Sequence, residues 1–159
     1  MLGVFTDDLD QPAPGTLALV RIVALPQLGI AFIKPKIDTG ARSSSLHTSE
    51  VEEFRRGDRT FVTFKVHPIQ RNKDFGVRAE AEVLEYRSVK SSSGHREYRP
   101  IIRTLVQLGG ERWPIDLTLT TRDAMGFRML LGREAIRKRF VVDPGRSYLF
   151  PELVPKKRK

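Results

Sequence analysis

The stretch Lys36-Ile37-Asp38-Thr39-Gly40-Ala41 places an aspartate at the end of an apolar segment and directly before a turn. The extended segment 30–33 leads into it, and the serine-rich segment 43–47 follows it. Gly40 allows the backbone to turn and another chain to approach closely, and the hydroxyl of Thr39 can bond to a second copy of the same loop. Such turns are also common in loops. The string alone therefore leaves open a structural aspartate whose carboxylate accepts backbone N–H groups.

A second informative stretch lies near the end of the chain and reads Met129-Leu130-Leu131-Gly132-Arg133-Glu134-Ala135-Ile136, an apolar run, then Gly-Arg, then a short helical pattern. Together the two strings resemble those of retroviral-type aspartic proteases (retropepsins). In that family D-T-G-A comes early, and an apolar-apolar-Gly-Arg segment later leads into a helix. The separation of Asp38 and Gly132 exceeds what the family usually allows, and one insertion at about residues 64–99 accounts for the excess.

Four strings bring the chain closer still to a bacterial family of retropepsin-like proteins that carries the label ATP-dependent zinc protease. The four strings are 36–47 (K-I-D-T-G-A-R-S-S-S-L-H), 66–68 (V-H-P), 99–102 (R-P-I-I) and 130–133 (L-L-G-R). The resemblance covers residues 15–148, nearly the full chain. Members are found beside ATP-grasp glutamate ligases that add glutamates to a ribosomal protein. The resemblance therefore implies trimming of acidic tails and a ligase of this kind as a partner.

Composition is that of a single soluble globular domain. The chain has 159 residues, 40% hydrophobic content, a mean hydropathy of −0.32 and no cysteine. Disulfides, thiolate nucleophiles and cysteine-based zinc sites are therefore excluded. No apolar run reaches the length of a transmembrane helix, and the acidic N-terminus is unlike a signal peptide. We expect a cytoplasmic protein without a membrane partner.

The chain is strongly basic, with a net charge of +9 and a pI of about 10.2. A basic surface attracts polyanions such as acidic polypeptide, RNA or DNA. However, four of the positive charges lie in the terminal run 156–159, and the arginines elsewhere are spread along the chain. Basic residues are not interleaved with aromatic residues as on a nucleic-acid platform. Nucleic acid is thus an unlikely partner, although a protein of the ribosome surface stays an alternative.

The pattern of short alternating segments predicts a closed all-β barrel with one short helix, and the resemblance implies that this barrel is of the retropepsin type. We expect a flexible segment at 1–14, one domain over 15–150 and a basic tail at 151–159. Expected strands are 17–25, 30–37, 61–67, 77–86, 100–108, 113–120, 127–131 and 140–142, and the expected helix is 133–139. Two of these strands, joined by Gly109 and Gly110, form a hairpin. Pro35 favours an edge position or a bulge for its strand.

Aspartic-protease chemistry needs two carboxylates that share one proton. One of them acts as a base on water, and the other acts as an acid to the substrate carbonyl. The chain has one D-T-G, so the mechanism requires a homodimer in which each copy supplies Asp38 on a two-fold axis. Asp38, Thr39 and Gly40 are the predicted catalytic residues.

Lys36, Ala41, Arg42 and Arg133 are the predicted substrate-binding residues. In retropepsins the residue after D-T-G-A is usually an aspartate that pairs with the arginine of the late Gly-Arg, but here it is Arg42. Arg133 is then expected to pair with Glu134, Asp143 or a substrate carboxylate. Guanidinium groups bind carboxylates in a bidentate fork, so the site would favour acidic peptide. Ordinary solvated arginines are the alternative.

A cofactor is not expected. The three histidines, His47, His67 and His95, are far apart in the sequence and form no H-E-x-x-H motif, although three distant histidines and a water can hold zinc. The chain also has no P-loop for ATP. A zinc-dependent peptidase and a non-catalytic module that binds an acidic peptide or a ligase therefore stay open as alternatives.

Overall fold

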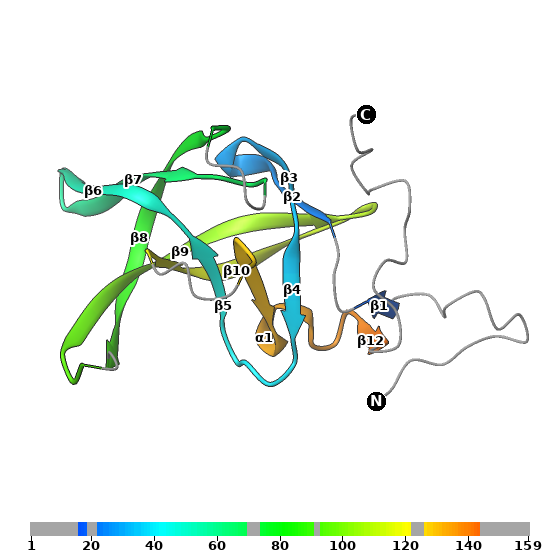
Figure 1. Ribbon diagram of the computed structural model, residues 1–159. Helices are drawn as coiled ribbons and strands as arrows, with labels where there is room; N and C mark the ends of the chain where they lie inside the picture. The colour runs from blue at the N-terminus through cyan, green and yellow to red at the C-terminus, as the bar shows by residue number, and fades with distance from the viewer. Residues whose placement is uncertain (1–15, 19–21, 70–73, 91–92, 122–125, 144–159) are drawn as a thin grey trace, which may run out of the picture.

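The computed structural model describes residues 16–18, 22–69, 74–90, 93–121 and 126–143, and these are mostly β-strand with one short helix (Figure 1). The elements are β1 (Thr16–Ala18), β2 (Val23–Leu25), the 3-10 turn η1 (Pro26–Leu28), β3 (Ile30–Ile33), β4 (Pro35–Asp38), β5 (Ser44–His47), β6 (Ser49–Arg56), β7 (Arg59–Val66), β8 (Val77–Lys90), β9 (Arg96–Leu108), β10 (Glu111–Thr120), β11 (Met129–Gly132), α1 (Arg133–Ile136) and β12 (Val141–Asp143). The expected N-terminal segment 1–14 and the tail 151–159 lie outside the described residues.

The main sheet has ten strands, of which eight follow the order β4-β11-β5-β10-β9-β8-β7-β6. β2 pairs with both β3 and β9, and a separate parallel pair joins β1 to β12. Among the described strands, β4 at one end of the order does not pair with β6 at the other. The mostly β architecture is thus confirmed, whereas the closed barrel expected from the sequence is not.

Alternating side chains build the core from the middle of the sheet. Along β10, Trp113, Ile115, Leu117 and Leu119 are buried, while the intervening Asp116 is exposed, as expected when successive side chains point to opposite faces. The indole Nε1 of Trp113 also donates a buried hydrogen bond of 2.7 Å to the carbonyl oxygen of Ala135 in α1. The core therefore holds α1 firmly against the sheet.

Two expectations about the sheet are confirmed. β9 and β10 form the expected antiparallel hairpin, in which Leu108 pairs with Glu111 across the turn at Gly109 and Gly110. Pro35 begins β4, which stands at the end of the sheet order, and proline is tolerated at the first residue of an edge strand. The expected strand 30–37 is divided at Lys34 into β3 and β4.

Several elements differ from the sequence-based expectation, among them β5, a strand that is missing from the expected set. α1 ends at Ile136 instead of residue 139, because Arg137 is extended and Lys138 has a φ of 63°. β8 continues to Lys90 and forms with β9 a long two-stranded arm that projects from the body of the molecule (Figure 1). β6 was not expected; it is an edge strand with a mostly exposed, Glu- and Arg-rich sequence, so it lacks an apolar alternation. No helix in the described part of the chain is long and apolar enough to span a membrane.

Candidate active site

The two sequence motifs meet in space. β4 and β11 are parallel neighbours, and their register places Gly132 opposite Asp38 at the ends of both strands. Ile37 and Leu131, which precede these two residues, are buried in the core. The apolar parts of both motifs therefore anchor the strands, and the polar residues emerge together where the strands end.

Hydrogen bonds within the turn orient the Asp38 carboxylate. Its Oδ1 accepts bonds from the backbone N–H of Gly40 at 2.9 Å and of Ala41 at 3.2 Å. Gly40 does not have a positive φ. A β-carbon there would lie 3.2 Å from this same Oδ1, so glycine lets the carboxylate approach the backbone closely. The other oxygen of the half-buried Asp38, Oδ2, accepts no hydrogen bond from any residue that the structure describes. One oxygen is fixed by the turn, and the other is available.

Thr39 is exposed at the tip of the turn, and its hydroxyl has no hydrogen-bond partner within the described ranges. This arrangement leaves the hydroxyl available for the predicted bond to a second copy of the loop.

Backbone contacts lock the Asp38 turn to the start of α1. The N–H of Arg133 donates to the carbonyl oxygen of Ala41 at 2.8 Å, and the N–H of Glu134 donates to that of Arg42 at 3.1 Å. The N–H of Gly132 donates a buried bond of 3.0 Å to the hydroxyl oxygen of Ser44. These bonds hold the segment after Asp38 and the Gly-Arg segment in one fixed unit.

The charged residues predicted to bind substrate surround this unit but do not pair as expected. The Arg133 guanidinium donates to the carbonyl oxygen of Gly40 at 3.3 Å, and no ion pair of Arg133 is present among the described residues. Glu134 instead pairs with Arg42 at 3.9 Å and with Arg137 at 3.4 Å. Of the three expected partners of Arg133, Glu134 does not pair with it here, because the Arg133 side chain turns back over the Asp38 loop; the side chain of Asp143 lies outside the described part of the structure, and a substrate carboxylate stays a prediction.

Two further predicted residues are Lys36 and Ala41. Lys36 is exposed and stands two residues before Asp38 in β4, so both side chains are on the same face of the strand. Ala41 is half-buried and contributes through its backbone, which bonds to both Asp38 and Arg133. An ammonium group and two guanidinium groups thus come from strand and loop segments next to the carboxylate.

The histidines are separate from this site and from one another. His47 Nδ1 lies 3.3 Å from the Arg128 guanidinium. His67 bonds to Ser49 at 3.4 Å and to the carbonyl oxygen of Phe75 at 3.1 Å, and His95 is exposed next to β9. No group of three or more His, Asp or Glu side chains in the described part of the chain could hold a metal ion. Within the described ranges, the His, Asp and Glu side chains thus supply no donor set for the zinc alternative.

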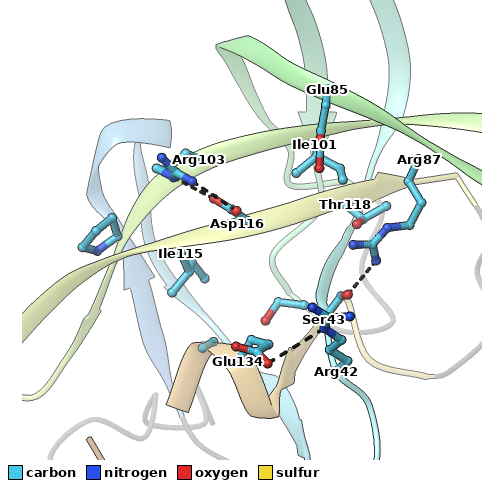
Figure 2. A pocket seen from close by; sticks show the side chains of 13 residues that line it. Arg42, Ser43, Glu85, Arg87, Ile101, Arg103, Ile115, Asp116, Thr118 and Glu134 are labelled. Atoms are coloured by element: carbon cyan, nitrogen blue, oxygen red, sulfur yellow. Dashed lines mark hydrogen bonds and ion pairs between the residues drawn. The ribbon is translucent and has the colours of Figure 1, made fainter. Parts of the chain in front are cut away.

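A groove of about 600 Å³ opens beside the Asp38 loop (Figure 2). It is lined by parts of β5, β8, β9, β10 and α1, together with Arg42 and Ser43. Arg87 of β8 reaches into it and donates a hydrogen bond of 2.6 Å to the Ser43 hydroxyl. Sequence reasoning did not single out Arg87 or Ser43, since an arginine on an alternating strand is typical of any solvated strand face.

A carboxylate oriented by a D-T-G turn and held against a Gly-Arg strand end, in a mostly β chain, defines a retropepsin-like protein. The family model described as "Retropepsin-like aspartic endopeptidase RimB" matches residues 19–152, and the chain belongs to this RimB-like family.

Similar proteins include longer chains and a solved structure. A protein of Shewanella pealeana named "Probable alpha-L-glutamate ligase" is 45% identical over 129 residues, which are 81% of this chain and 28% of that protein. A protein of Parasynechococcus marenigrum with the same name is 48% identical over 82% of this chain and 28% of its own length. The chain therefore spans little more than a quarter of these relatives. A crystal structure of a Legionella pneumophila protein of unknown function matches with a TM-score of 0.70 and 26% identity, over 86% of this chain and 98% of that one.

Proposed function

We propose that this chain is an aspartic-type peptidase of the cytoplasm in which two copies each contribute Asp38 to one catalytic dyad. The observation that carries the proposal is the Asp38 turn: two backbone N–H groups hold Oδ1, while Oδ2 stays available at the end of a strand locked to Gly132. Membership in the RimB-like family supports the same activity.

The chemistry needs both copies because a single carboxylate cannot be base and acid at once. In the dimer, the ionised Asp38 of one copy removes a proton from water, which attacks the peptide carbonyl. The protonated Asp38 of the other copy donates its proton to the carbonyl oxygen. The exposed Thr39 hydroxyl supports this arrangement, since it can bond across a two-fold axis to the second loop.

The substrate we propose is an acidic, glutamate-rich peptide tail. Lys36, Arg42 and Arg133 surround the Asp38 loop, so a negatively charged chain would be attracted to it. The names of the longer relatives refer to glutamate ligases. An enzyme that adds glutamates and one that removes them would share a substrate, which also makes a ligase a proposed partner.

A binding module is the second candidate. In the relatives, a segment similar to this chain makes up about 28% of a protein named as a ligase, which supports a role in presenting the acidic tail without cleaving it. Fold alone does not separate the two functions.

An Asp38→Asn variant distinguishes the peptidase from the binding module. We expect the parent chain to shorten a peptide with a C-terminal run of glutamates, as measured by mass spectrometry, and Asp38→Asn to lose this activity while binding the peptide. The matched control is Asp58→Asn, which changes an exposed aspartate in the β6–β7 turn. Cleavage by Asp38→Asn at the parent rate would exclude the aspartic mechanism, and binding without cleavage by the parent would favour the module.

A further inference from the structure

Among the described residues that line the groove, Arg87 is the arginine without a carboxylate partner. Its one hydrogen bond within the described residues goes to the Ser43 hydroxyl at 2.6 Å, and its side chain is exposed. A guanidinium has five N–H donors in a planar fork. A single bond to a neutral hydroxyl leaves most of these donors free to bind an anion.

The other two arginines of the groove, Arg42 and Arg103, each have a carboxylate partner. Arg103 forms a two-pronged pair with Asp116, with bonds of 2.8 and 3.3 Å. Glu134 lies between Arg42 and Arg137. In contrast to Arg103, Arg42 has only a long contact of 3.9 Å and a side chain that is 77% exposed, so it adds positive potential at the Ser43 end of the groove.

Besides Glu134, which contacts Arg42, and Asp116, which pairs with Arg103, the groove is lined by a third carboxylate, that of Glu85. Glu85 lies two residues before Arg87 in β8, on the same face, and it has no partner among the residues described. Figure 2 shows the two side chains pointing to different places: Glu85 lies over Ile101, while Arg87 reaches down to Ser43. The groove is therefore positively charged at its Ser43 end, and the Glu85 carboxylate places a negative charge near Ile101.

We propose that Arg87 and Ser43 form a subsite that binds a carboxylate group of an acidic peptide, and that Glu85 restricts the anion to the Ser43 end. This inference rests on the proposed function in one respect, that the bound peptide is the substrate. Arg42 provides a second cation beside the subsite. A planar guanidinium beside a hydroxyl suits a carboxylate, because both can donate hydrogen bonds to its two oxygens.

The subsite is close enough to Asp38 to act on the same peptide. β11 lies between β4 and β5, and Ser43 directly precedes β5. Two strand spacings of about 4.8 Å each separate β4 from β5, so Ser43 and Asp38 are about 10 Å apart. An extended peptide covers about 3.3 Å per residue. Arg87 would then hold a side chain about three residues from the bond that is cleaved.

The test measures peptide binding. All substitutions are made in the Asp38→Asn chain, which removes cleavage from the measurement. The probe is a fluorescent peptide that ends in six glutamates, followed by anisotropy, with the matching glutamine peptide as reference. Loss of one charged hydrogen-bonding group weakens binding about tenfold or more. We expect this loss of affinity for the glutamate peptide in Arg87→Gln. Glu85→Gln should tighten binding several-fold, which a purely structural role for these residues would not produce.

The matched control is the double variant Arg103→Gln, Asp116→Asn, which removes a satisfied pair from the same groove and keeps the net charge. It should bind the glutamate peptide within about twofold of the parent, as expected for an exposed pair of small net value. Unchanged binding by Arg87→Gln in a chain with parental circular dichroism would overturn the proposal. So would equal affinity for the two peptides, or Arg87-dependent binding of a short single-stranded RNA in place of the glutamate peptide. Residual cleavage by Asp38→Asn would count against the proposed aspartic mechanism and not against the Arg87 subsite.

Discussion

The carbonyl oxygen of Ser43 lies 2.5 Å from the position that a β-carbon on Gly132 would occupy. The carbonyl oxygen of Arg42 lies 2.8 Å from the same position. Gly132 has a φ of −82° and a ψ of 171°, a conformation open to any residue. The glycine is therefore required by space and not by backbone conformation: it lets the segment after Asp38 pass directly over the end of β11.

Gly132→Ala tests this packing. The added methyl group meets backbone atoms, which cannot rotate away, so the Asp38 turn and β11 must separate. We expect a loss of about 1–3 kcal/mol in the free energy of unfolding, typical of overpacking, together with loss of peptidase activity. Urea unfolding measures the first quantity. The control is Gly110→Ala, where nothing lies within 4 Å of the added carbon. Equal stability of the two variants would contradict the close approach.

Ser44→Ala tests the buried bond beneath the same contact. Ser44 is 3% exposed, and its hydroxyl oxygen accepts the N–H of Gly132 at 3.0 Å. Without the hydroxyl, that N–H is buried and unpaired, which costs about 1–3 kcal/mol. Ser45→Ala, one residue further along β5 and half-buried, is the control and should change the unfolding free energy by much less. A smaller effect for Ser44→Ala than for Ser45→Ala would contradict the assigned bond.

The meeting of the two motifs could be predicted from the sequence because each consists of a buried apolar run followed by residues that cannot be buried. Ile37 before Asp38 and Leu131 before Gly132 bring both strands into one core, and the polar residues then emerge together. The β9–β10 hairpin was predictable for a similar reason, since its alternation and its Gly-Gly turn are both local signals.

Features that depend on long-range geometry could not be predicted. Arg87 and Ser43 are 44 residues apart and meet only because β8 crosses the groove near the start of β5. Arg133 bonds to Gly40, a choice that depends on how the loops lie and not on charge matching. The open order of the sheet likewise depends on which edges pair, and alternating sequences are equally compatible with closed and open sheets.

Mixing the parent chain with Asp38→Asn tests whether the dyad is shared between copies. If subunits exchange freely between dimers, equal amounts should lower the activity per parent chain to about half, because about a quarter of all dimers then contain two parent subunits. The measurement is the rate on the glutamate-tailed peptide after incubation, with a mixture of the parent and the active Asp58→Asn chain as the control, which should keep full activity. Full activity in the mixture, with subunit exchange demonstrated by mass spectrometry, would show that one copy suffices.

Arg42 offers a test of specificity that is independent of Arg87. Its guanidinium is 77% exposed and only weakly held by Glu134 at 3.9 Å, so it can turn toward a substrate that lies along the Asp38 loop. Removing it also leaves Glu134 with one cation fewer, since Arg137 alone remains at 3.4 Å. Both changes make the local potential more negative where the peptide would lie.

We therefore expect Arg42→Ala to slow hydrolysis of a glutamate tail much more than hydrolysis of a matched glutamine tail. A well-formed charged hydrogen bond is worth about 1.5–3 kcal/mol, and part of the preference for glutamate should fade with added salt, because exposed charges are screened over about 10 Å at 0.1 M. The measurement is the ratio of kcat/KM for the two tails at low and high salt. Arg56→Ala is the control. Arg56 is an exposed arginine of β6 that pairs with Glu80 of β8, and β6 is at the opposite end of the sheet order from β4. Equal rates on both tails in the parent, or equal effects of the two substitutions, would mean that the basic residues around Asp38 do not select the substrate.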